Sequence, residues 1–317
     1  MRAVYLESGQ VSVRDIPELE LPAGFARIKM LAAGICNTDL ELQRGYYGFA
    51  GVPGHEFCGE VVEGPSAWIG RRVVGEINLA CGHCSRCEEG MGRHCAARTV
   101  LGIIGHPGAF AETLTLPVEN LLAVPDDLST EHAVFTEPVA AACEILDQVN
   151  IPQGEPVAVL GDGKLGLLIA QVLHAHGGRV HQFGRHAEKL AISAQAGIST
   201  ELTNGKLPLA EYRLVIDATG SALGLRQAVA LTKPRGTVVM KSTVHGEVAI
   251  DFASVIVNEI TLVGSRCGRF EPALELLRTG RVDVSRMIDS RFALTNAAQA
   301  FPKAAGKGVL KVLLLPD

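Results

Sequence analysis

The sequence lacks several features that define whole classes of protein. Aromatic residues make up only 5% of the 317 residues, with one Trp and four Tyr, so no aromatic platform for a sugar ring is evident. No uncharged apolar run approaches the ~20 residues that a membrane-spanning helix needs. The first fifteen residues contain no apolar core of signal-peptide length, so we expect a cytoplasmic protein.

Neither sign of charge dominates the chain. The 34 acidic residues exceed the 29 basic ones, and the net charge is −5. This mild acidity gives no electrostatic reason to expect a nucleic acid or an anionic membrane as a partner. The sequence also contains no internal repeat and no low-complexity tract.

What is present indicates a folded protein with two domains. Hydrophobic residues make up 47% of a chain long enough for two cores. The first 120 or so residues contain short β-branched runs separated by Gly and Pro, which predicts a β-rich region. From about residue 125, helical patterns alternate with short apolar strands, which indicates a parallel, doubly wound α/β sheet. We expect its strands at 157–160, 180–183, 214–217, 237–240 and 260–263, and helices at 164–176 and 222–231.

Half of the eight cysteines fall within fifteen residues, in the spacing C-x2-C-x2-C-x7-C: Cys81, Cys84, Cys87 and Cys95. Four thiolates this close can surround one tetrahedral Zn²⁺, and closed all-cysteine sites are structural rather than catalytic. A disulfide cluster would suit a short secreted chain, and an iron–sulfur run with the same start places its fourth cysteine closer. The spacing therefore predicts a structural zinc site.

A glycine-rich turn joins the strand expected at 157–160 to the following helix. It reads G-D-G-K-L-G over residues 161–166, which is G-x-G-x-x-G between a strand and a helix. Gly161 permits the tight turn, Gly163 lets the backbone approach a pyrophosphate, and Gly166 lets the helix pack on the strand. Since a helix N-terminus attracts anions, we predict a dinucleotide site here that includes Lys164 and Leu165.

The end of the next strand bears on the choice of cofactor. An acid is expected there if the ribose carries a free 2′-hydroxyl, but that position is Gly184. Arg185 follows at once, and Lys189 lies one helical turn later. A missing carboxylate removes the repulsion of a 2′-phosphate, and a guanidinium can clamp it. We therefore favour NADP over NAD, although Arg185 could also be a solvated residue at a strand end.

Two further segments contain metal-ligand residue types. Cys36 lies in G-I-C-N-T-D over 34–39, and His55 lies in G-H-E over 54–56. Taken singly, such residues are usually part of the core or satisfied polar groups. Together they offer thiolate, imidazole and carboxylate ligands, but their spacing alone does not establish that they meet.

With these segments in hand, the chain resembles the zinc-containing medium-chain dehydrogenase/reductase superfamily of the alcohol dehydrogenase type. The resemblance covers nearly the whole chain and rests on five motifs: 34–39, 54–56, the four-cysteine segment, E-P-V-A at 137–140, and G-x-G-x-x-G. It implies a GroES-like catalytic domain at 1–124, with a zinc lobe at 81–95, completed by 266–317. It also implies a Rossmann dinucleotide-binding domain at 125–265, with the active site in the cleft between the two.

The same resemblance implies a catalytic zinc held by Cys36 and His55. The third ligand separates branches of the family, and the Glu-Pro motif is closest to the polyol, threonine and glucose dehydrogenase branches. Glu137 is therefore the candidate third ligand, while Glu56 ligates or approaches the zinc in these branches. Cys143, six residues after Glu137, is expected to be a core residue of a helix.

The resemblance also implies the reaction. Zinc would lower the pKa of a bound alcohol, and hydride would pass between its carbon and the nicotinamide ring. The hydroxyl of Thr38 could begin a proton relay towards the cofactor ribose, although an ordinary turn threonine is the alternative. Asp39 would orient a zinc ligand. Many relatives have a histidine two residues after this aspartate, where this chain has Glu41, so the family's last relay step to solvent is not expected here.

Further cofactor contacts are expected where strands of the parallel sheet end, because ligands bind outside the carboxyl ends of such strands. The candidates are Thr219 in the segment 217–220, Ser242 in the segment 241–243, and Ser265 in the segment 264–266. Each of these residues could equally belong to an ordinary loop.

The sequence thus predicts a zinc-dependent NAD(P)-dependent alcohol or polyol dehydrogenase with two zinc ions per chain, one catalytic and one structural. Its partners would be a small alcohol or carbonyl substrate and, as a homodimer or homotetramer, copies of itself. A non-catalytic, nucleotide-binding redox sensor on the same fold is the main alternative. A zinc module that binds partners through its lobe is a weaker one, because Arg86 and Arg93 are offset by Glu88 and Glu89. A zinc-free quinone reductase would lack both the catalytic ligand set and the four-cysteine lobe.

Overall fold

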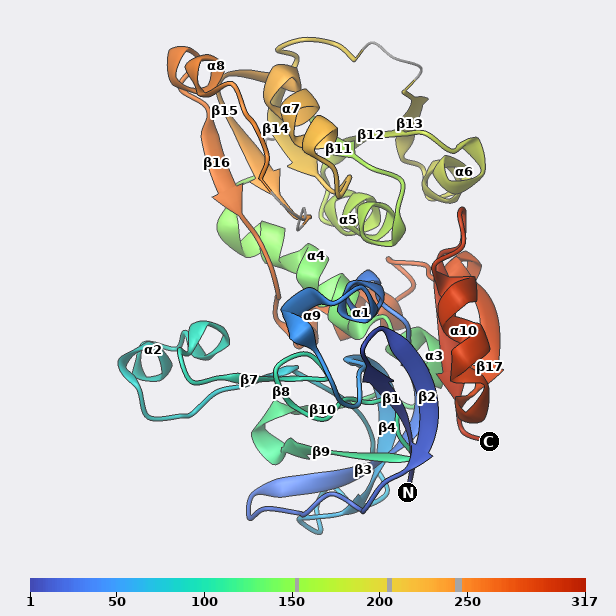
Figure 1. Cartoon of the computed structure of the whole chain (residues 1–317). Coiled ribbons are helices and arrows are strands. Elements are labelled where there is room, and N and C mark those ends of the chain that lie inside the picture. Colours follow the sequence, from blue (N-terminus) through green and yellow to red (C-terminus); the bar gives the residue numbers. More distant parts are fainter. Residues whose placement is uncertain (152–153, 204–206, 243–246) are drawn as a thin grey trace. The chain divides into compact units, whose positions relative to one another are not determined.

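The computed structural model describes residues 1–151, 154–203, 207–242 and 247–317 (Figure 1). The chain forms two units, one of Met1–Glu137 with Val284–Asp317 and the other of Pro138–Asp283. The first is rich in antiparallel strands and the second is a parallel α/β unit, as predicted. Our functional domain limits, 1–124 with 266–317 and 125–265, remain a proposal. No described helix is long and apolar enough to cross a membrane.

The first unit is built on one large sheet with the strand order β10-β5-β4-β3-β18-β17, in which β9 also pairs with β3. Its pairs are antiparallel except for β17 with β18. The strands are β3 (Phe25–Gly34), β4 (Glu56–Glu63), β5 (Arg72–Gly75), β9 (Thr113–Pro117), β10 (Leu121–Ala123), β17 (Ile288–Ala293) and β18 (Lys311–Leu315). Strand β18 therefore returns from the end of the chain to complete a sheet formed by its beginning.

Two smaller sheets belong to the same unit. Strands β1 (Arg2–Glu7) and β2 (Gln10–Asp15) form an antiparallel hairpin. Strands β6 (Asn78–Leu79), β7 (Thr99–Leu101) and β8 (Gly105–His106) form a sheet at the base of the four-cysteine lobe. The helices of this unit are α1 (Asn37–Gln43), α2 (Ser85–Glu88), α3 (Thr130–Ala133) and α10 (Ala297–Ala304), and α4 (Thr136–Gln148) begins in it.

The second unit contains a parallel sheet with the order β13-β12-β11-β14-β15-β16. The order reverses beside β11, the first strand of this sheet along the chain, which is the arrangement of doubly wound dinucleotide-binding folds. The strands are β11 (Pro156–Leu160), β12 (Arg179–Gly184), β13 (Ser199–Leu202), β14 (Tyr212–Asp217), β15 (Thr232–Met240) and β16 (Thr261–Gly264). The helices are most of α4, α5 (Lys164–Ala175), α6 (Ala187–Gln195), α7 (Ala222–Leu231), α8 (Phe252–Val257) and α9 (Phe270–Arg278).

The register of this sheet brings its carboxyl ends into line. Leu160 at the end of β11 pairs with Phe183 of β12 and with Asp217 of β14, which in turn pairs with Met240 of β15. Met240 pairs with Gly264 of β16. The loops that begin after these residues therefore start along one edge of the sheet, where such folds bind their ligands.

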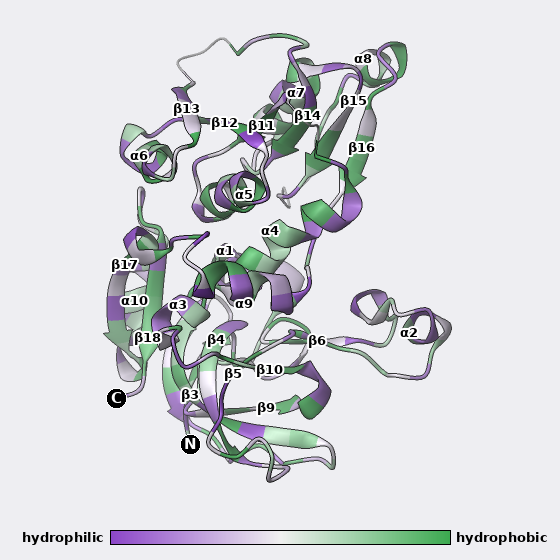
Figure 2. Cartoon of the chain, turned by 180° about the vertical axis from the view of Figure 1, so that it is seen from behind, coloured by the Kyte–Doolittle hydropathy of each residue, from purple (hydrophilic) through white to green (hydrophobic). Residues whose placement is uncertain are grey.

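Apolar side chains hold the second unit together. The central strands β11, β14 and β15 have runs of fully buried Val, Ile and Ala, as expected for a parallel sheet covered on both faces. Helix α8 differs, since Figure 2 colours most of it as hydrophobic while Phe252, Ile256 and Val257 are exposed. Because the residues of β11 are buried, packing holds in place the strand from which the glycine-rich turn starts.

Candidate functional site: two metal-ligand clusters and a dinucleotide turn

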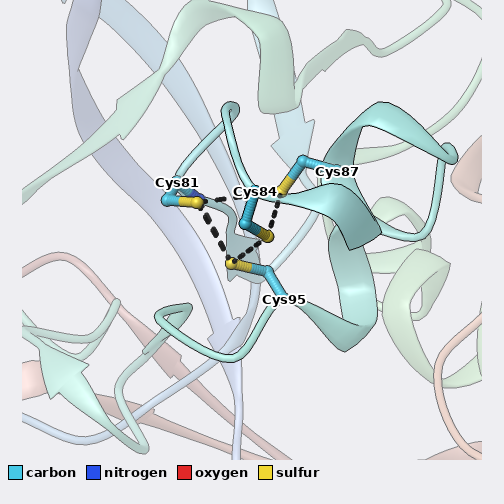
Figure 3. Close-up of side chains that lie close together, drawn as sticks. All are labelled: Cys81, Cys84, Cys87 and Cys95. Carbon is cyan, nitrogen blue, oxygen red and sulfur yellow. Dashed lines mark hydrogen bonds between the residues drawn. The ribbon is translucent and has the colours of Figure 1, made fainter.

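The four cysteines of the lobe turn their sulfur atoms towards one another (Figure 3). The Sγ–Sγ distances are 3.5 Å for Cys84–Cys87 and Cys95–Cys81, 3.8 Å for Cys84–Cys95, and 3.9 Å for Cys81–Cys87. A tetrahedron with zinc–sulfur bonds of about 2.3 Å has edges of ~3.8 Å. The four residues therefore fit one zinc ion, and the distances suit a metal better than a set of disulfides.

Backbone groups prepare this cluster for a cation. The Cys81 N–H donates to Cys95 Sγ at 3.5 Å. This contact is the main reason that the pKa of Cys95 is lowered to about 6, with smaller contributions from the other sulfurs and the backbone of Ala97. Because the thiolate is the form that binds metal, the lobe favours the required charge state at Cys95.

A second cluster lies in the same unit and consists of Cys36, His55 and Glu56, whose ligand atoms all lie within 4.8 Å of one another. Cys36 is the N-cap of α1, and Glu56 is the first residue of β4. Their meeting follows from the pairing of β3 with β4, in which Gly34 lies opposite Glu56. The thiolate, imidazole and carboxylate donors fit a transition metal such as zinc.

Asp39 holds this cluster in place. Its carboxylate is fully buried and accepts hydrogen bonds from the backbone N–H of Cys36 at 2.8 Å and of Gly54 at 3.2 Å. Its Oδ1 lies 3.4 Å from Nδ1 of His55. Burial opposes protonation of His55, but Asp39 and the Cys36 sulfur outweigh it and raise the pKa of the imidazole well above its ordinary value. With Nδ1 facing Asp39, Nε2 is the nitrogen left for a metal.

Thr38 and Glu137 lie near this cluster in different ways. Thr38 Oγ1 is 3.7 Å from Cys36 Sγ, so its hydroxyl is beside the predicted metal ligand. Glu137 is in the first turn of α4 and is not in the group of donors within 4.8 Å. Burial, opposed by the charge of His55 and aided by that of Glu56, raises the pKa of Glu137 to about 7. Cys143, further along α4, is buried as expected for a core residue.

Glu56 has a partner that our sequence analysis did not predict. Lys311, the first residue of β18, forms an ion pair with the Glu56 carboxylate, and both side chains are almost fully buried. The Lys311 ammonium also lies 5.5 Å from the centre of the Phe135 ring. Burial works against the charge on Lys311, but Glu56 and other nearby negative groups raise its pKa. The carboxylate of Glu56 is therefore compensated by a cation of the chain itself.

Gly34 makes room for this pair. A Cβ at position 34 would lie 2.7 Å from Glu56 Oε2, 2.9 Å from Val134 Cγ1 and 3.1 Å from Lys311 Cδ. The glycine of the G-I-C-N-T-D segment thus allows two charged side chains to meet beside the strand that leads to Cys36.

The glycine-rich turn has the geometry that its sequence predicts. Gly161 has φ +117°, and a Cβ there would lie 2.6 Å from the carbonyl oxygen of Ala218. A Cβ at Gly166 would lie 2.3 Å from the Gly161 carbonyl oxygen, whereas one at Gly163 would meet nothing within 4 Å. Gly163 is the N-cap of α5, so Lys164 and Leu165 form its first turn. Open space at Gly163 is what the approach of a pyrophosphate requires.

The other predicted cofactor residues lie along the same edge of the sheet. Arg185 is exposed directly after β12, and Lys189 is half-buried in α6. Thr219 Oγ1 donates to Asp217 at 2.7 Å. Ser265 accepts from Lys241 Nζ at 2.9 Å, so this hydroxyl already has a partner within the loop. Ser242 follows β15, while Thr243 lies outside the described residues.

Comparison with known families gives the chain its place. Residues 22–126 match the alcohol dehydrogenase GroES-like domain, and residues 165–279 match the zinc-binding dehydrogenase family. An L-threonine 3-dehydrogenase of Streptomyces avermitilis is 31% identical, and the alignment covers 99% of each chain. The chain belongs to the zinc-type medium-chain dehydrogenase/reductase superfamily.

Two solved members of this superfamily were obtained with different cofactors. A zinc-binding dehydrogenase from Sinorhizobium meliloti 1021, bound to NADP, is 31% identical with a TM-score of 0.90. A protein from Escherichia coli CFT073 described as a short chain alcohol dehydrogenase (rspB), in complex with NADH, is 27% identical with a TM-score of 0.89. Both alignments cover 99% of each chain. Since one fold serves both cofactors, residues particular to each chain must decide between them.

Within this zinc-type dehydrogenase, three positioning residues were not predicted from the sequence. Lys311 is a single cation at the start of an otherwise apolar strand, K-V-L-L-L, and this pattern does not distinguish a buried counterion from a solvated strand end. Gln182 is fully buried, and its side-chain amide donates to the Gly161 carbonyl oxygen at 2.8 Å. Asp162 occupies a variable position of the glycine motif and contacts the end of β12. The last two depend on side-chain contacts between neighbouring strands, which no spacing rule contains.

Proposed function

We propose that the protein is a zinc-dependent oxidoreductase that interconverts an alcohol and its aldehyde or ketone by hydride transfer to or from NADP(H). The observation that carries this proposal is the meeting of the Cys36 thiol and the His55 imidazole, with the Glu56 carboxylate beside them, all within 4.8 Å. Catalytic zinc sites use such mixed donors and leave one position open, whereas structural sites are closed. The G-x-G-x-x-G turn supports the cofactor part of the proposal.

Charge balance indicates which residues bind the catalytic zinc and which residue only lies beside it. We propose that Cys36, His55 and Glu137 hold the catalytic zinc and that Glu56 lies beside it. One thiolate and one carboxylate neutralise the ion, while the charge of Glu56 is already compensated by Lys311. When bound, zinc supplies the Lewis acidity that favours loss of the alcohol proton and polarises a carbonyl in the reverse reaction.

The residues around the metal ligands have proposed roles of their own. Asp39 fixes the orientation of both ligand segments through its hydrogen bonds to Cys36 and Gly54. Thr38 receives the alcohol proton at Oγ1 and passes it towards the cofactor ribose, a role that its place beside Cys36 supports. A small alcohol, such as a primary or secondary alcohol, a polyol or a sugar, is the proposed substrate.

The remaining parts of the proposal concern stability and the cofactor. A second zinc ion held by the four-cysteine lobe is structural, because all its donors are used and no position is left for a substrate. NADP is favoured over NAD because Gly184 replaces the acid that would repel a 2′-phosphate and Arg185 follows it. We also propose assembly as a homodimer or homotetramer.

The test is cofactor reduction by zinc-loaded protein across primary and secondary alcohols, polyols, sugars and hydroxyamino acids, each with NADP⁺ and with NAD⁺. The variant Cys36→Ser should lose one zinc per chain and all turnover while still binding NADPH. Cys143→Ala, which removes a core thiol outside both clusters, should keep two zinc ions and its activity. Turnover by Cys36→Ser would show that the catalytic-zinc proposal is wrong.

The sensor alternative makes a different prediction for the same experiment. It expects nucleotide binding without turnover of any substrate class, even by protein that holds both zinc ions. The retention of Cys36, His55 and Glu137 favours the enzyme, since a sensor has no need of an open metal site.

A further inference from the structure

A buried lysine lies where strand β15 ends. Lys241 directly follows Met240, the last residue of β15, and is only 7% exposed. A lysine is almost never buried to this extent unless its ammonium group has partners. Its Nζ donates to Ser265 Oγ at 2.9 Å and to the backbone carbonyl oxygen of Arg266. The side chain of Lys241 therefore holds the segment that follows β16.

The register of the two strands explains these contacts. Strands β15 and β16 are neighbours in the parallel sheet, and Met240 pairs with Gly264 (Figure 1). Lys241 and Ser265 are thus the first residues beyond the paired part of each strand. The backbone N–H of Ser265 also donates to the Met240 carbonyl oxygen at 3.1 Å. Ser265 is therefore tied to the end of β15 by its backbone and by the lysine.

Helix α4 holds the two ends of the same segment. The side-chain amide of Gln148 donates to the Gly264 carbonyl oxygen at 3.2 Å. At the other end, the guanidinium of Arg269 donates two hydrogen bonds to the Asp147 carboxylate, at 2.9 and 3.0 Å. Helix α4 thus fixes both ends of the segment 264–269, and the lysine fixes its middle.

The chemistry of an ammonium group sets the direction of the contacts in the middle. An ammonium can only donate hydrogen bonds, so the Ser265 hydroxyl oxygen and the Arg266 carbonyl oxygen both act as acceptors for Lys241. Both oxygens are therefore directed towards the end of β15, and the backbone between them is held with them. A neutral side chain of the same length at position 241 would leave both oxygens without this donor.

The location of the segment gives these contacts a function. In doubly wound folds, the glycine-rich turn after the first strand faces the pyrophosphate, and the end of the second strand faces the adenosine ribose. Those strands are β11 and β12, and β14, β15 and β16 lie on the other side of β11. The remaining half of a dinucleotide, which carries the nicotinamide, therefore extends along the carboxyl ends of these three strands. The segment 264–269 begins at that edge.

We propose that Lys241 is a positioning residue that holds Ser265 and Arg266 in the conformation that binds the nicotinamide half of the cofactor. The inference rests on the proposed binding of a nicotinamide dinucleotide and deepens it, because it assigns a buried cation to one half of that ligand. Lys241 acts through the segment that it holds and does not need to touch the cofactor. Its loss should therefore weaken the binding of the nicotinamide half alone.

Calorimetry with pairs of ligands that differ only in the nicotinamide tests the inference. NADP⁺ is compared with 2′-phospho-ADP-ribose, which lacks the nicotinamide ring, and NAD⁺ is compared with ADP-ribose in the same way. Lys241→Met keeps the length of the side chain but has no donor. It should bind NADP⁺ about tenfold more weakly than the wild type, which is the size of one hydrogen bond to a charged group. Its affinity for 2′-phospho-ADP-ribose should be unchanged.

Lys233→Met is the matched control, because it makes the same substitution at the amino end of the same strand. The Lys233 side chain is 40% exposed, and its Nζ lies 4.0 Å from the Glu155 carboxylate. This variant should bind all four nucleotides as the wild type does. A loss of NADP⁺ affinity in Lys233→Met as large as that in Lys241→Met would count against a specific role of Lys241.

Ser265→Ala gives a second test if the lysine variant does not fold, since it removes one acceptor and keeps the buried cation. It should weaken NADP⁺ less than Lys241→Met does and should also spare 2′-phospho-ADP-ribose. Adding it to Lys241→Met should cause no further loss, because both changes remove the same contact. Equal losses for the two ligands of a pair, or unchanged NADP⁺ affinity in both variants, would overturn the inference.

Failure of the proposed function would look different. If the wild type binds none of the four nucleotides, the dinucleotide site itself is wrong, and the inference falls with it. A wild type that binds both ligands of a pair, with variants that bind them equally well, would instead exclude only the role of Lys241.

Discussion

Removing the Lys311 ammonium should expose how strongly this fold depends on one buried ion pair. Lys311→Met keeps most of the side-chain volume but leaves the Glu56 carboxylate without a cation. Both partners are almost fully buried, so solvent cannot compensate the charge. Breaking such a pair costs about 3–5 kcal/mol, a large share of the 5–15 kcal/mol that stabilises a typical domain.

The single tryptophan, Trp68, makes the measurement specific. It lies in the first unit and is half-buried, so its fluorescence during urea unfolding reports on the unit that contains the pair. The matched control is the double variant Glu56→Met with Lys311→Met, which replaces both charges by apolar side chains and should recover most of the stability. Equal stability of Lys311→Met and the wild type, or an equal loss in the double variant, would refute the reasoning.

Three further predictions concern the other parts of the site. Cys95→Ala should reduce the zinc content by one ion per chain and lower the free energy of unfolding by several kcal/mol; unchanged melting would exclude a structural role for the lobe. Gly184→Ala should weaken both NADP⁺ and NAD⁺ by about tenfold, because the new Cβ displaces Asp162, and calorimetry would detect this. Because the pKa of Glu137 is raised to about 7, its folded form holds a proton that the unfolded chain releases. The free energy of unfolding of the zinc-free protein, measured by urea titration, should therefore fall as the pH rises from 5 to 8. In Glu137→Gln, the part of this fall that comes from Glu137 should be absent.

The second unit could be predicted from the sequence wherever its strands are buried. The strand expected at 157–160 is β11, Pro156–Leu160, and the helix expected at 222–231 is α7, Ala222–Leu231. In both cases, continuous apolar residues or their helical spacing reflect burial directly. The glycine motif was equally informative, since a positive φ at Gly161 and a neighbouring backbone atom at Gly166 decide the residue at those positions.

Strand β13 and helix α6 were not predicted, and the reason is physical. β13 (Ser199–Leu202) is at the edge of the sheet and mostly exposed, so its residues have no apolar pattern. It is held by backbone pairing with β12 from His181↔Ser199 to Gly184↔Leu202. α6 buries only Leu190 and Ser193, which is too short a stripe to indicate a helix. An element that is held mainly by backbone hydrogen bonds to its neighbours has little recognisable pattern in its own side chains.

The candidate metal site shows the same limit at longer range. Cys36, His55 and Glu56 could be proposed as metal-site residues from short motifs, because their residue types are those of metal ligands. Lys311 could not, since it lies 255 positions from Glu56 and reaches it only because β18 pairs with β3. A single lysine before four apolar residues predicts a solvated strand end. Only the pairing of β18 with β3 shows that this lysine is a buried counterion. If the ion pair with Lys311 leaves Glu137 rather than Glu56 to bind zinc, strand β18 influences the proposed chemistry without supplying a metal ligand.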